Sequence, residues 1–241
     1  MGKVYLGILA GTGFYDLGLF DDTESVEVET PYGRPSAPYE IGYYKGKGIA
    51  FLPRHGKEHT IPPHRVNFCA NIWGLKELGV EKVIGINSMG SLKPEIRPPC
   101  IAIPHDYVSF FDIPTFYNNE VKHATPKIDE DMRSLLIKAA KDIGLNVRDN
   151  AVAVQTRGPR FETPAEIRIL AGWGDLVGMN MASEATLCSE LSIPYANIAT
   201  VDNYANGVMG EVPTFEKVLS NSKRNAERVR SLLKKAVEIL F

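Results

Sequence analysis

The sequence predicts an α/β protein with a mixed central sheet flanked by helices. Short apolar runs alternate with longer amphipathic segments along most of the chain. Several of these runs are continuously apolar, which is typical of strands that are covered on both faces. The chain has 241 residues, which is enough to bury one substantial core, and it shows no repeat and no linker. We therefore expect a single domain over residues 1–241.

Strand patterns occur in seven segments, which are residues 4–9, 48–52, 82–86, 100–103, 151–155, 175–178 and 195–201. Each is a short run rich in apolar residues. Their alternation with helical segments gives an α/β sheet. The sheet is mixed if residues 31–51 form a hairpin.

Helical patterns occur in five segments, which are residues 63–78, 129–143, 164–171, 184–191 and 215–240. In the second, apolar residues from Met132 to Ile143 recur at the spacing of one helix face. The third opens with Thr163-Pro164-Ala165-Glu166, a capping box with proline at the first helical position. The last is expected to pack on the core as one long helix. Residues 110–127 contain two prolines and two adjacent asparagines, and we expect a loop that is functional or lies at a subunit contact.

Composition and charge argue against several function classes. The net charge is −2, which gives no reason to expect a nucleic acid partner. No apolar stretch approaches the roughly 20 residues that span a bilayer, and the N-terminus lacks the pattern of a signal peptide, so we expect no membrane partner. Cys69, Cys100 and Cys188 lie far apart, without a C-x-x-C pair. This spacing argues against a disulfide framework or a structural zinc site and fits a reducing, cytoplasmic location.

The first motif with chemistry in it is Gly11-Thr12-Gly13, directly behind the first apolar run and paired in our interpretation with Arg54-His55. Glycine lets backbone N–H groups approach an oxyanion closely, and arginine can donate two parallel hydrogen bonds to phosphate oxygens. A dinucleotide fingerprint needs a third glycine at position 16, where the chain has Asp16. The motif therefore favours a site for free phosphate over a site for a pyrophosphate-bearing cofactor.

Four polar clusters follow predicted strands, and they are residues 87–91, 158–163, 178–184 and 202–204. In open α/β sheets, ligands bind at the carboxyl ends of the strands. We therefore expect the four clusters to line one pocket.

Together these motifs resemble the trimeric purine nucleoside phosphorylases of the methylthioadenosine phosphorylase branch. The stretches that carry the resemblance are Gly11-Thr12-Gly13, Arg54-His55-Gly56 with His59-Thr60 and Asn71-Ile72-Trp73, Gly158-Pro159-Arg160-Phe161-Glu162-Thr163, and Val177-Gly178-Met179. The resemblance implies the nucleoside phosphorylase fold and an enzyme of purine salvage. Its reaction is the attack of inorganic phosphate on C1′ of a purine nucleoside, which gives a free purine and ribose 1-phosphate. It further implies no metal or organic cofactor, phosphate as co-substrate, and a homotrimer or a dimer of trimers.

The resemblance also implies roles for individual residues. Thr12, Arg54, His55, Ser88 and Asn180 match the phosphate site; Asn203 and Glu162 match the catalytic residues at the purine; Met179, Phe161, Phe215 and His123 match substrate contacts, His123 from a loop that one subunit places over its neighbour's substrate. Purely structural alternatives exist, since Met179 could be core, Glu162 a first-turn carboxylate of a helix, and Asn203 a turn residue. His59, His64 and His105 are expected to be structural.

The departures from the family pattern bear on the substrate. Adenosine-type members tend to carry aspartate at position 203 and a small hydroxyl residue at position 162, whereas Asn203 and Glu162 are the 6-oxopurine pairing. Phe215 stands where inosine and guanosine enzymes have a histidine for the 5′-hydroxyl, and it suits a 5′-methylthio group instead. Ser183 and Met181 also depart, standing where a proline and a threonine are usual.

These departures favour 5′-methylthioinosine as the substrate, with inosine and guanosine as weaker substrates. The first alternative is an S-methyl-5′-thioadenosine phosphorylase in which Glu162 is protonated or turned away. The second is a nucleoside-binding protein without turnover, against which the phosphate motif argues.

Overall fold

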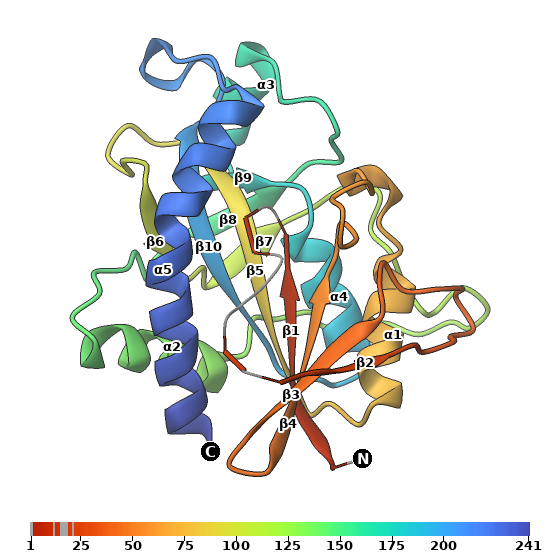
Figure 1. Ribbon diagram of the computed structural model, residues 1–241. Helices are drawn as coiled ribbons and strands as arrows, with labels where there is room; N and C mark the ends of the chain where they lie inside the picture. The colour runs from red at the N-terminus through yellow and green to blue at the C-terminus, as the bar shows by residue number, and fades with distance from the viewer. Residues whose placement is uncertain (1, 12, 15–18, 21) are drawn as a thin grey trace.

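A mixed sheet of ten strands forms the centre of the part of the chain that the computed structural model describes, residues 2–11, 13–14, 19–20 and 22–241 (Figure 1). Its strands are β1 Val4–Ala10, β2 Glu24–Val26, β3 Tyr39–Tyr44, β4 Lys47–Pro53, β5 Lys82–Ser91, β6 Cys100–Ala102, β7 Asp106–Val108, β8 Val152–Gln155, β9 Leu176–Gly178 and β10 Tyr195–Tyr204. The helices are α1 Phe68–Glu77, α2 Glu130–Asp142, α3 Pro164–Leu170, α4 Met181–Glu190 and α5 Phe215–Leu240, with short 3₁₀ turns at Pro63–Arg65 and Val208–Gly210.

The sheet order is β2-β3-β4-β1-β5-β9-β8-β7, and β10 pairs with both β5 and β6. Strand β1 runs parallel to β4 and β5, and β10 runs parallel to β5. The antiparallel pairs β2–β3 and β3–β4 make the sheet mixed, as the predicted hairpin requires.

Helices cover both faces of the sheet, because neighbouring strand residues point to opposite sides. On β5, Val83 packs into the cluster that holds α1 and α4, and Ile84 packs into the cluster that holds α2 and α5. In Figure 1, α2 and α5 lie together on the left, and α1 and α4 lie on the right. Both β5 residues are almost completely buried, which explains the continuous apolar runs in the sequence.

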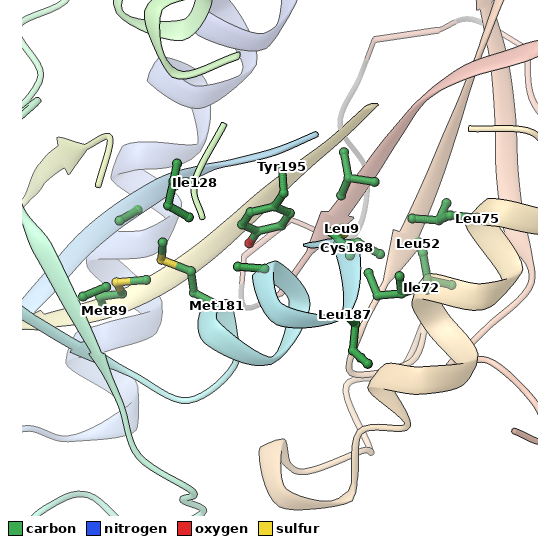
Figure 2. Packing of buried hydrophobic residues seen from close by; sticks show 14 of the residues in the cluster. Leu9, Leu52, Ile72, Leu75, Met89, Ile128, Met181, Leu187, Cys188 and Tyr195 are labelled. Atoms are coloured by element: carbon green, nitrogen blue, oxygen red, sulfur yellow. The ribbon is translucent and has the colours of Figure 1, made fainter. Parts of the chain in front are cut away.

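Helix α4 begins at the candidate site described below, and its buried side chains pack in the same cluster as those of α1. Leu187 and Cys188 on α4 are buried on the side where Ile72 and Leu75 of α1 lie, and Met181 at the start of α4 is buried beside Met89 and Ile128 (Figure 2). None of the described helices is both long and apolar enough to span a bilayer.

All seven predicted strands and all five predicted helices are present, and residues 110–127 contain no helix or strand, as predicted. The boundaries differ in instructive ways. The first helix begins at Phe68, not at residue 63. The chain first forms a 3₁₀ turn over Pro63–Arg65, preceded by Pro62, and the side chain of Asn67 then caps the helix. Strands β5 and β10 run on to Ser91 and Tyr204, past their apolar runs, because their polar residues stay paired and buried. Strands β2 and β7 were not predicted, and β3 was expected only as part of a possible hairpin over residues 31–51.

Candidate active site

A cavity of about 470 Å³ opens where β1, β4, β5, β9 and β10 end. Nine of the predicted site residues line it, namely Arg54, His55, Ser88, Phe161, Glu162, Met179, Asn180, Asn203 and Phe215. Thr12 lies outside the described residues, although its neighbour Gly11 lines the cavity. His123 does not line the cavity and is exposed in the single chain. The four polar clusters therefore contribute to one pocket, as predicted.

Unequal strand lengths create the cavity. Strand β1 pairs with β5 only as far as Ala10 opposite Ile86, whereas β5 continues to Ser91 alongside β10. Ser88, Met89 and Gly90 consequently lie beyond the end of β1 and line the cavity. This carboxyl edge of parallel strands is where α/β sheets bind ligands.

Arg54 is completely buried below the cavity and its guanidinium is held from several sides. Its Nε donates to Glu184 Oε1 at 2.5 Å, Nη2 donates to Leu9 O at 2.7 Å and to Glu184 Oε2 at 3.3 Å, and Nη1 donates to Ile86 O at 2.7 Å. Arginine has five N–H groups, so these four bonds leave a single N–H, on Nη1. The expected bidentate donation to phosphate is therefore wrong for this arrangement, and Arg54 can offer phosphate one hydrogen bond and its charge.

Glu184 is the partner that orients Arg54, and sequence reasoning missed it. It is completely buried on α4 and also accepts a hydrogen bond from the Tyr195 hydroxyl at 2.9 Å. Burial raises the pKa of Glu184, while the charge and hydrogen bonds of Arg54 act in the opposite direction. The pair lies 130 positions apart in the sequence, so no local pattern reveals it.

Gly11 makes room for the one remaining N–H of Arg54. A Cβ at this position would lie 2.7 Å from Nη1 of Arg54 and 3.4 Å from Nε2 of His55. The glycine is required here by this close approach and not by an unusual backbone angle.

His55 presents an unprotonated nitrogen beside Gly11. Its Nδ1 lies 2.8 Å from Ile61 O, and because a carbonyl oxygen only accepts, Nδ1 carries the proton and Nε2 is an acceptor. Burial and then the charge of Arg54 lower the pKa of His55 to about 4, against a backbone hydrogen bond that raises it. A neutral imidazole can accept the O–H of a hydrogenphosphate ion.

Asn180 and Ser88 complete the polar end of the cavity. Asn180 is the N-cap of α4, and its nearly buried Oδ1 has no partner among the described residues. The helix N-terminus that it opens favours anions. Ser88 lies opposite on β5, and its hydroxyl donates to Asp202 Oδ2 at 2.6 Å.

Glu162 and Asn203 also line the cavity, and the side chain of each is held by a hydrogen bond. Thr156 Oγ1 donates to Glu162 Oε1 at 2.6 Å, which leaves Oε2 as an acceptor, and Glu162 directly precedes the capping box at the start of α3. Asn203 Nδ2 donates to Tyr204 O at 2.8 Å, so a second N–H remains on that nitrogen. Glu162 and Asn203 are 7% and 6% exposed, which excludes a simple surface or turn role.

An apolar corner of the cavity is formed by Phe215, Val218 and Pro213. His59 also lines the cavity here, and its ring stacks on Phe215 with centroids 6.0 Å apart. The expectation of a structural role for His59 did not anticipate its place in the cavity lining. The signal that could have found it is its place in the same motif as Arg54 and His55.

The departure at Ser183 has a local explanation. Its N–H donates to Gln155 Oε1 at 3.2 Å, and its hydroxyl accepts from Gln155 Nε2 at 2.7 Å. A proline at this position has no N–H to donate.

Among the described residues there is no cluster of three or more His, Cys, Asp or Glu side chains that could hold a metal ion.

Comparison with known proteins identifies relatives along almost the whole chain. A family model described as "Phosphorylase superfamily" matches residues 5–238. A "Probable 6-oxopurine nucleoside phosphorylase" from Archaeoglobus fulgidus is 41% identical over 234 residues, covering 97% of this chain and 96% of that protein. An "S-methyl-5'-thioadenosine phosphorylase" from Pyrococcus horikoshii is 45% identical over 239 residues, covering 96% of this chain and 91% of that protein. The solved structure of a methylthioadenosine phosphorylase from Schistosoma mansoni in complex with adenine superposes with a TM-score of 0.90 at 30% identity, covering 99% of this chain and 92% of that one.

Proposed function

The chain belongs to the phosphorylase superfamily, as an enzyme of its purine nucleoside branch, and from this premise we propose that it favours 5′-methylthioinosine. Inosine and guanosine are its weaker substrates in this proposal. The products are a free 6-oxopurine and 5-methylthioribose 1-phosphate or ribose 1-phosphate. The observation that carries the proposal is the presence of Glu162 and Asn203 in the lining of the same cavity as Arg54 and His55.

The phosphate end supplies an oriented nucleophile. The Nη1 N–H of Arg54 donates to one phosphate oxygen, the N-terminus of α4 faces another, and His55 Nε2 accepts the O–H of hydrogenphosphate. A phosphate oxygen then forms a bond to C1′ while the bond from C1′ to N9 breaks and leaves its electron pair on the purine. Catalysis consists of positioning and of stabilising charge at both ends.

The purine end distinguishes 6-oxopurines from adenine. Hypoxanthine and guanine present an N1–H donor, which Glu162 Oε2 can accept, and acceptors at O6 and N7, which the second N–H of Asn203 can meet. Adenine presents an acceptor at N1 instead, and two acceptors facing each other in a dry pocket cost a few kcal/mol.

The 5′ end favours a methylthio group over a hydroxyl. Phe215 and Val218 supply only apolar surface to this corner, where His59 is the neighbouring polar side chain and stacks on Phe215. Sulfur and a methyl group against an aromatic ring are favourable.

Substitution at the two purine residues tests the proposal. Asn203→Asp should lower the specificity constant for methylthioinosine and raise it for methylthioadenosine, because a carboxylate accepts from the 6-amino group and not from O6. The switch should be partial while Glu162 opposes N1 of adenine, and Glu162→Ser in the same chain should complete it. The measurement is the ratio of specificity constants for methylthioinosine and methylthioadenosine in the wild type, in each single variant and in the double variant. If the wild type already prefers methylthioadenosine, or if this ratio stays constant across the four enzymes, the alternative methylthioadenosine phosphorylase takes its place.

A change at Phe215 tests the 5′ site separately. Phe215→His should raise the specificity constant for inosine relative to methylthioinosine, because the imidazole can bond the 5′-hydroxyl, an effect of roughly tenfold for one hydrogen bond. Phe215→Leu, which stays apolar, is the matched control and should leave the ratio near that of the wild type. Equal ratios in all three enzymes would place the 5′ group elsewhere.

The proposal extends to the assembly and the location of the enzyme. We propose a homotrimer or dimer of trimers in the cytoplasm, with phosphate as co-substrate and no metal or organic cofactor. Support for a subunit contact comes from the exposed apolar side chains of the loop at 110–127 and its neighbour Trp173, where the rings of Phe110 and Trp173 meet at 5.1 Å. His123, in the same loop, would then reach the cavity of a neighbouring subunit.

A further inference from the structure

A buried carboxylate that the proposed mechanism leaves unused lies directly behind Ser88. The pairing of β10 with β5 skips one residue between Val201 and Asn203, so Asp202 is the extra residue of a β-bulge. Bulges redirect side chains. Here Asn203 lines the cavity, while Asp202 is completely buried and lies outside the lining.

Hydroxyl and amide donors from three elements converge on Asp202. Its Oδ2 accepts from Ser88 Oγ on β5 at 2.6 Å and from Thr200 Oγ1 on β10 at 2.7 Å. Its Oδ1 accepts from Asn225 Nδ2 on α5 at 2.9 Å. Three donors can satisfy the oxygens of an ionised carboxylate, but none of them carries a positive charge that would balance its negative charge.

Among the described residues, burial has the largest effect on the titration of Asp202, and the other causes are hydrogen bonds from neutral groups. Burial raises the pKa of Asp202 to about 6, and the hydrogen bonds from Ser88, Thr200 and Asn225 oppose that rise. The thiol of Cys100 on β6 responds to the charge of Asp202: burial and then that charge raise its pKa to about 11, while Arg148 and Arg228 act in the opposite direction. That thiol is neutral at the pH of any assay below about 9, and it provides no countercharge.

The state of Asp202 decides what Ser88 can offer to the cavity. A serine hydroxyl has one proton. When Asp202 is ionised, Ser88 donates that proton to the carboxylate and turns only lone pairs toward the cavity. Phosphate oxygens are acceptors as well, so this state opposes the phosphate that the proposed function requires.

We propose that Asp202 is a positioning residue that sets the direction of the Ser88 hydroxyl, and that phosphate binds preferentially to the enzyme form in which the Asp202 carboxyl carries a proton. In that form Asp202 donates to Ser88 Oγ, and Ser88 donates to a phosphate oxygen. Binding of phosphate is thus coupled to proton uptake behind the site. This inference rests on the phosphate site of the proposed function.

Asp202→Asn imitates the protonated form. With Asn225 Nδ2 still donating to the side-chain oxygen at position 202, the new amide nitrogen faces Ser88 and Thr200 and donates to both hydroxyls. The hydroxyl proton of Ser88 is then free for phosphate at every pH. The substitution keeps the size and shape of the side chain.

The test is the KM for phosphate of wild type and Asp202→Asn between about pH 6 and pH 8, at saturating nucleoside. The ratio of the two values cancels the titration of phosphate itself and of every group that the two enzymes share. If only the protonated form bound phosphate, the ratio would rise about tenfold per pH unit above about pH 6. Because Ser88 can also rotate away from the ionised carboxylate, we expect a rise of at least roughly threefold across the range. A ratio that stays constant with pH would assign Asp202 a structural role only and overturn the inference.

Two further variants keep the test decisive if Asp202→Asn folds poorly. In the Ser88→Ala background the ratio should be flat with pH, since the coupling runs through that hydroxyl. Thr200→Val removes a donor to the ionised carboxylate from a residue outside the cavity lining, so the pH at which the phosphate KM begins to rise should move upward. If the phosphate KM of Thr200→Val begins to rise at the same pH as that of the wild type, the result counts against the inference. Purine release that needs no phosphate would instead contradict the proposed function, so the two failures are distinguishable.

Discussion

At the scale of single residues, the proposed phosphate site depends on an N–H group of Arg54 that has no partner in the described part of the chain. Arg54 donates four of its five N–H groups to Glu184 and to two backbone carbonyls. Its remaining N–H lies beside Gly11. A buried arginine held in this way is preorganised, so it loses little side-chain entropy when phosphate binds.

Gly11→Ala should therefore raise the KM for phosphate, by roughly tenfold or more for the loss of one charge-assisted hydrogen bond. The added Cβ would lie 2.7 Å from Nη1 and must displace it. Gly172→Ala is the control, because its Cβ would meet only Ile169 O, at 3.3 Å, and Gly172 does not line the cavity. The measurement is steady-state phosphorolysis at varied phosphate, and equal KM values for Gly11→Ala and the wild type would refute the assignment.

The site residues could be predicted only in part from the sequence. Arg54, Glu162 and Asn203 were found because they follow strands and match family motifs. Glu184 and Asp202 fell within the predicted polar clusters, but their roles were not predicted, because a partner 130 or 114 positions away is decided by the packing of the whole sheet.

At the scale of elements, the start of α3 positions Glu162, which contacts the purine in the proposed function. Thr163 accepts from the N–H of Glu166 while the Glu166 side chain accepts from the N–H of Thr163, and Glu162 is the residue just before this box. Fixing the cap therefore fixes the backbone that carries Glu162.

Thr163→Ala should destabilise the protein by about 1 kcal/mol and also raise the KM for the nucleoside. Asp129→Ala removes the side-chain cap of α2, whose N-cap does not line the cavity, and should cost a similar free energy of unfolding with an unchanged KM. Urea unfolding and nucleoside saturation curves measure the two effects. A KM that rises equally in both variants would mean that the cap acts through stability alone.

Element types were predictable, whereas some boundaries were not. Continuous apolar runs identify β1, β4 and β8 because burial on both faces removes polar residues from them. Strands β2 and β7 are partly exposed and lack the buried apolar run that identifies the equally short strands β6 and β9. The bulge at Asp202 has no local signature, since it results from pairing with β5.

At the scale of the whole molecule, two buried groups give the stability opposite dependences on pH. The pKa of His55 falls from 6.5 to about 4, so the unfolded chain binds a proton that the folded protein does not, and stability decreases as pH falls through that window. The pKa of Asp202 rises from 3.8 to about 6, so the folded protein binds the extra proton, and stability decreases as pH rises through that window. The two contributions, each about 3 kcal/mol, largely offset each other.

Asp202→Asn removes one of the two contributions. Its free energy of unfolding, relative to that of the wild type, should rise by up to about 3 kcal/mol between pH 4 and pH 6. His55→Gln should show the opposite trend relative to the wild type. Urea unfolding at a series of pH values measures both, and parallel curves for all three proteins would contradict the burial that shifts these groups.

One sheet gathers strands from Val4–Ala10 through Tyr195–Tyr204, which agrees with the predicted fold class. The single domain over residues 1–241 and the trimer stay predictions. An oligomer depends on surfaces such as the loop at 110–127, whose exposed apolar side chains have no periodic pattern in the sequence.

The central claim is that this enzyme uses phosphate to cleave 6-oxopurine nucleosides with a preference for a 5′-methylthio group. The most direct measurement is purine release from methylthioinosine, inosine, guanosine, methylthioadenosine and adenosine, with and without phosphate. The account predicts no release without phosphate and the highest specificity constant for methylthioinosine. A higher specificity constant for methylthioadenosine, or equal release in phosphate-free buffer, would contradict it.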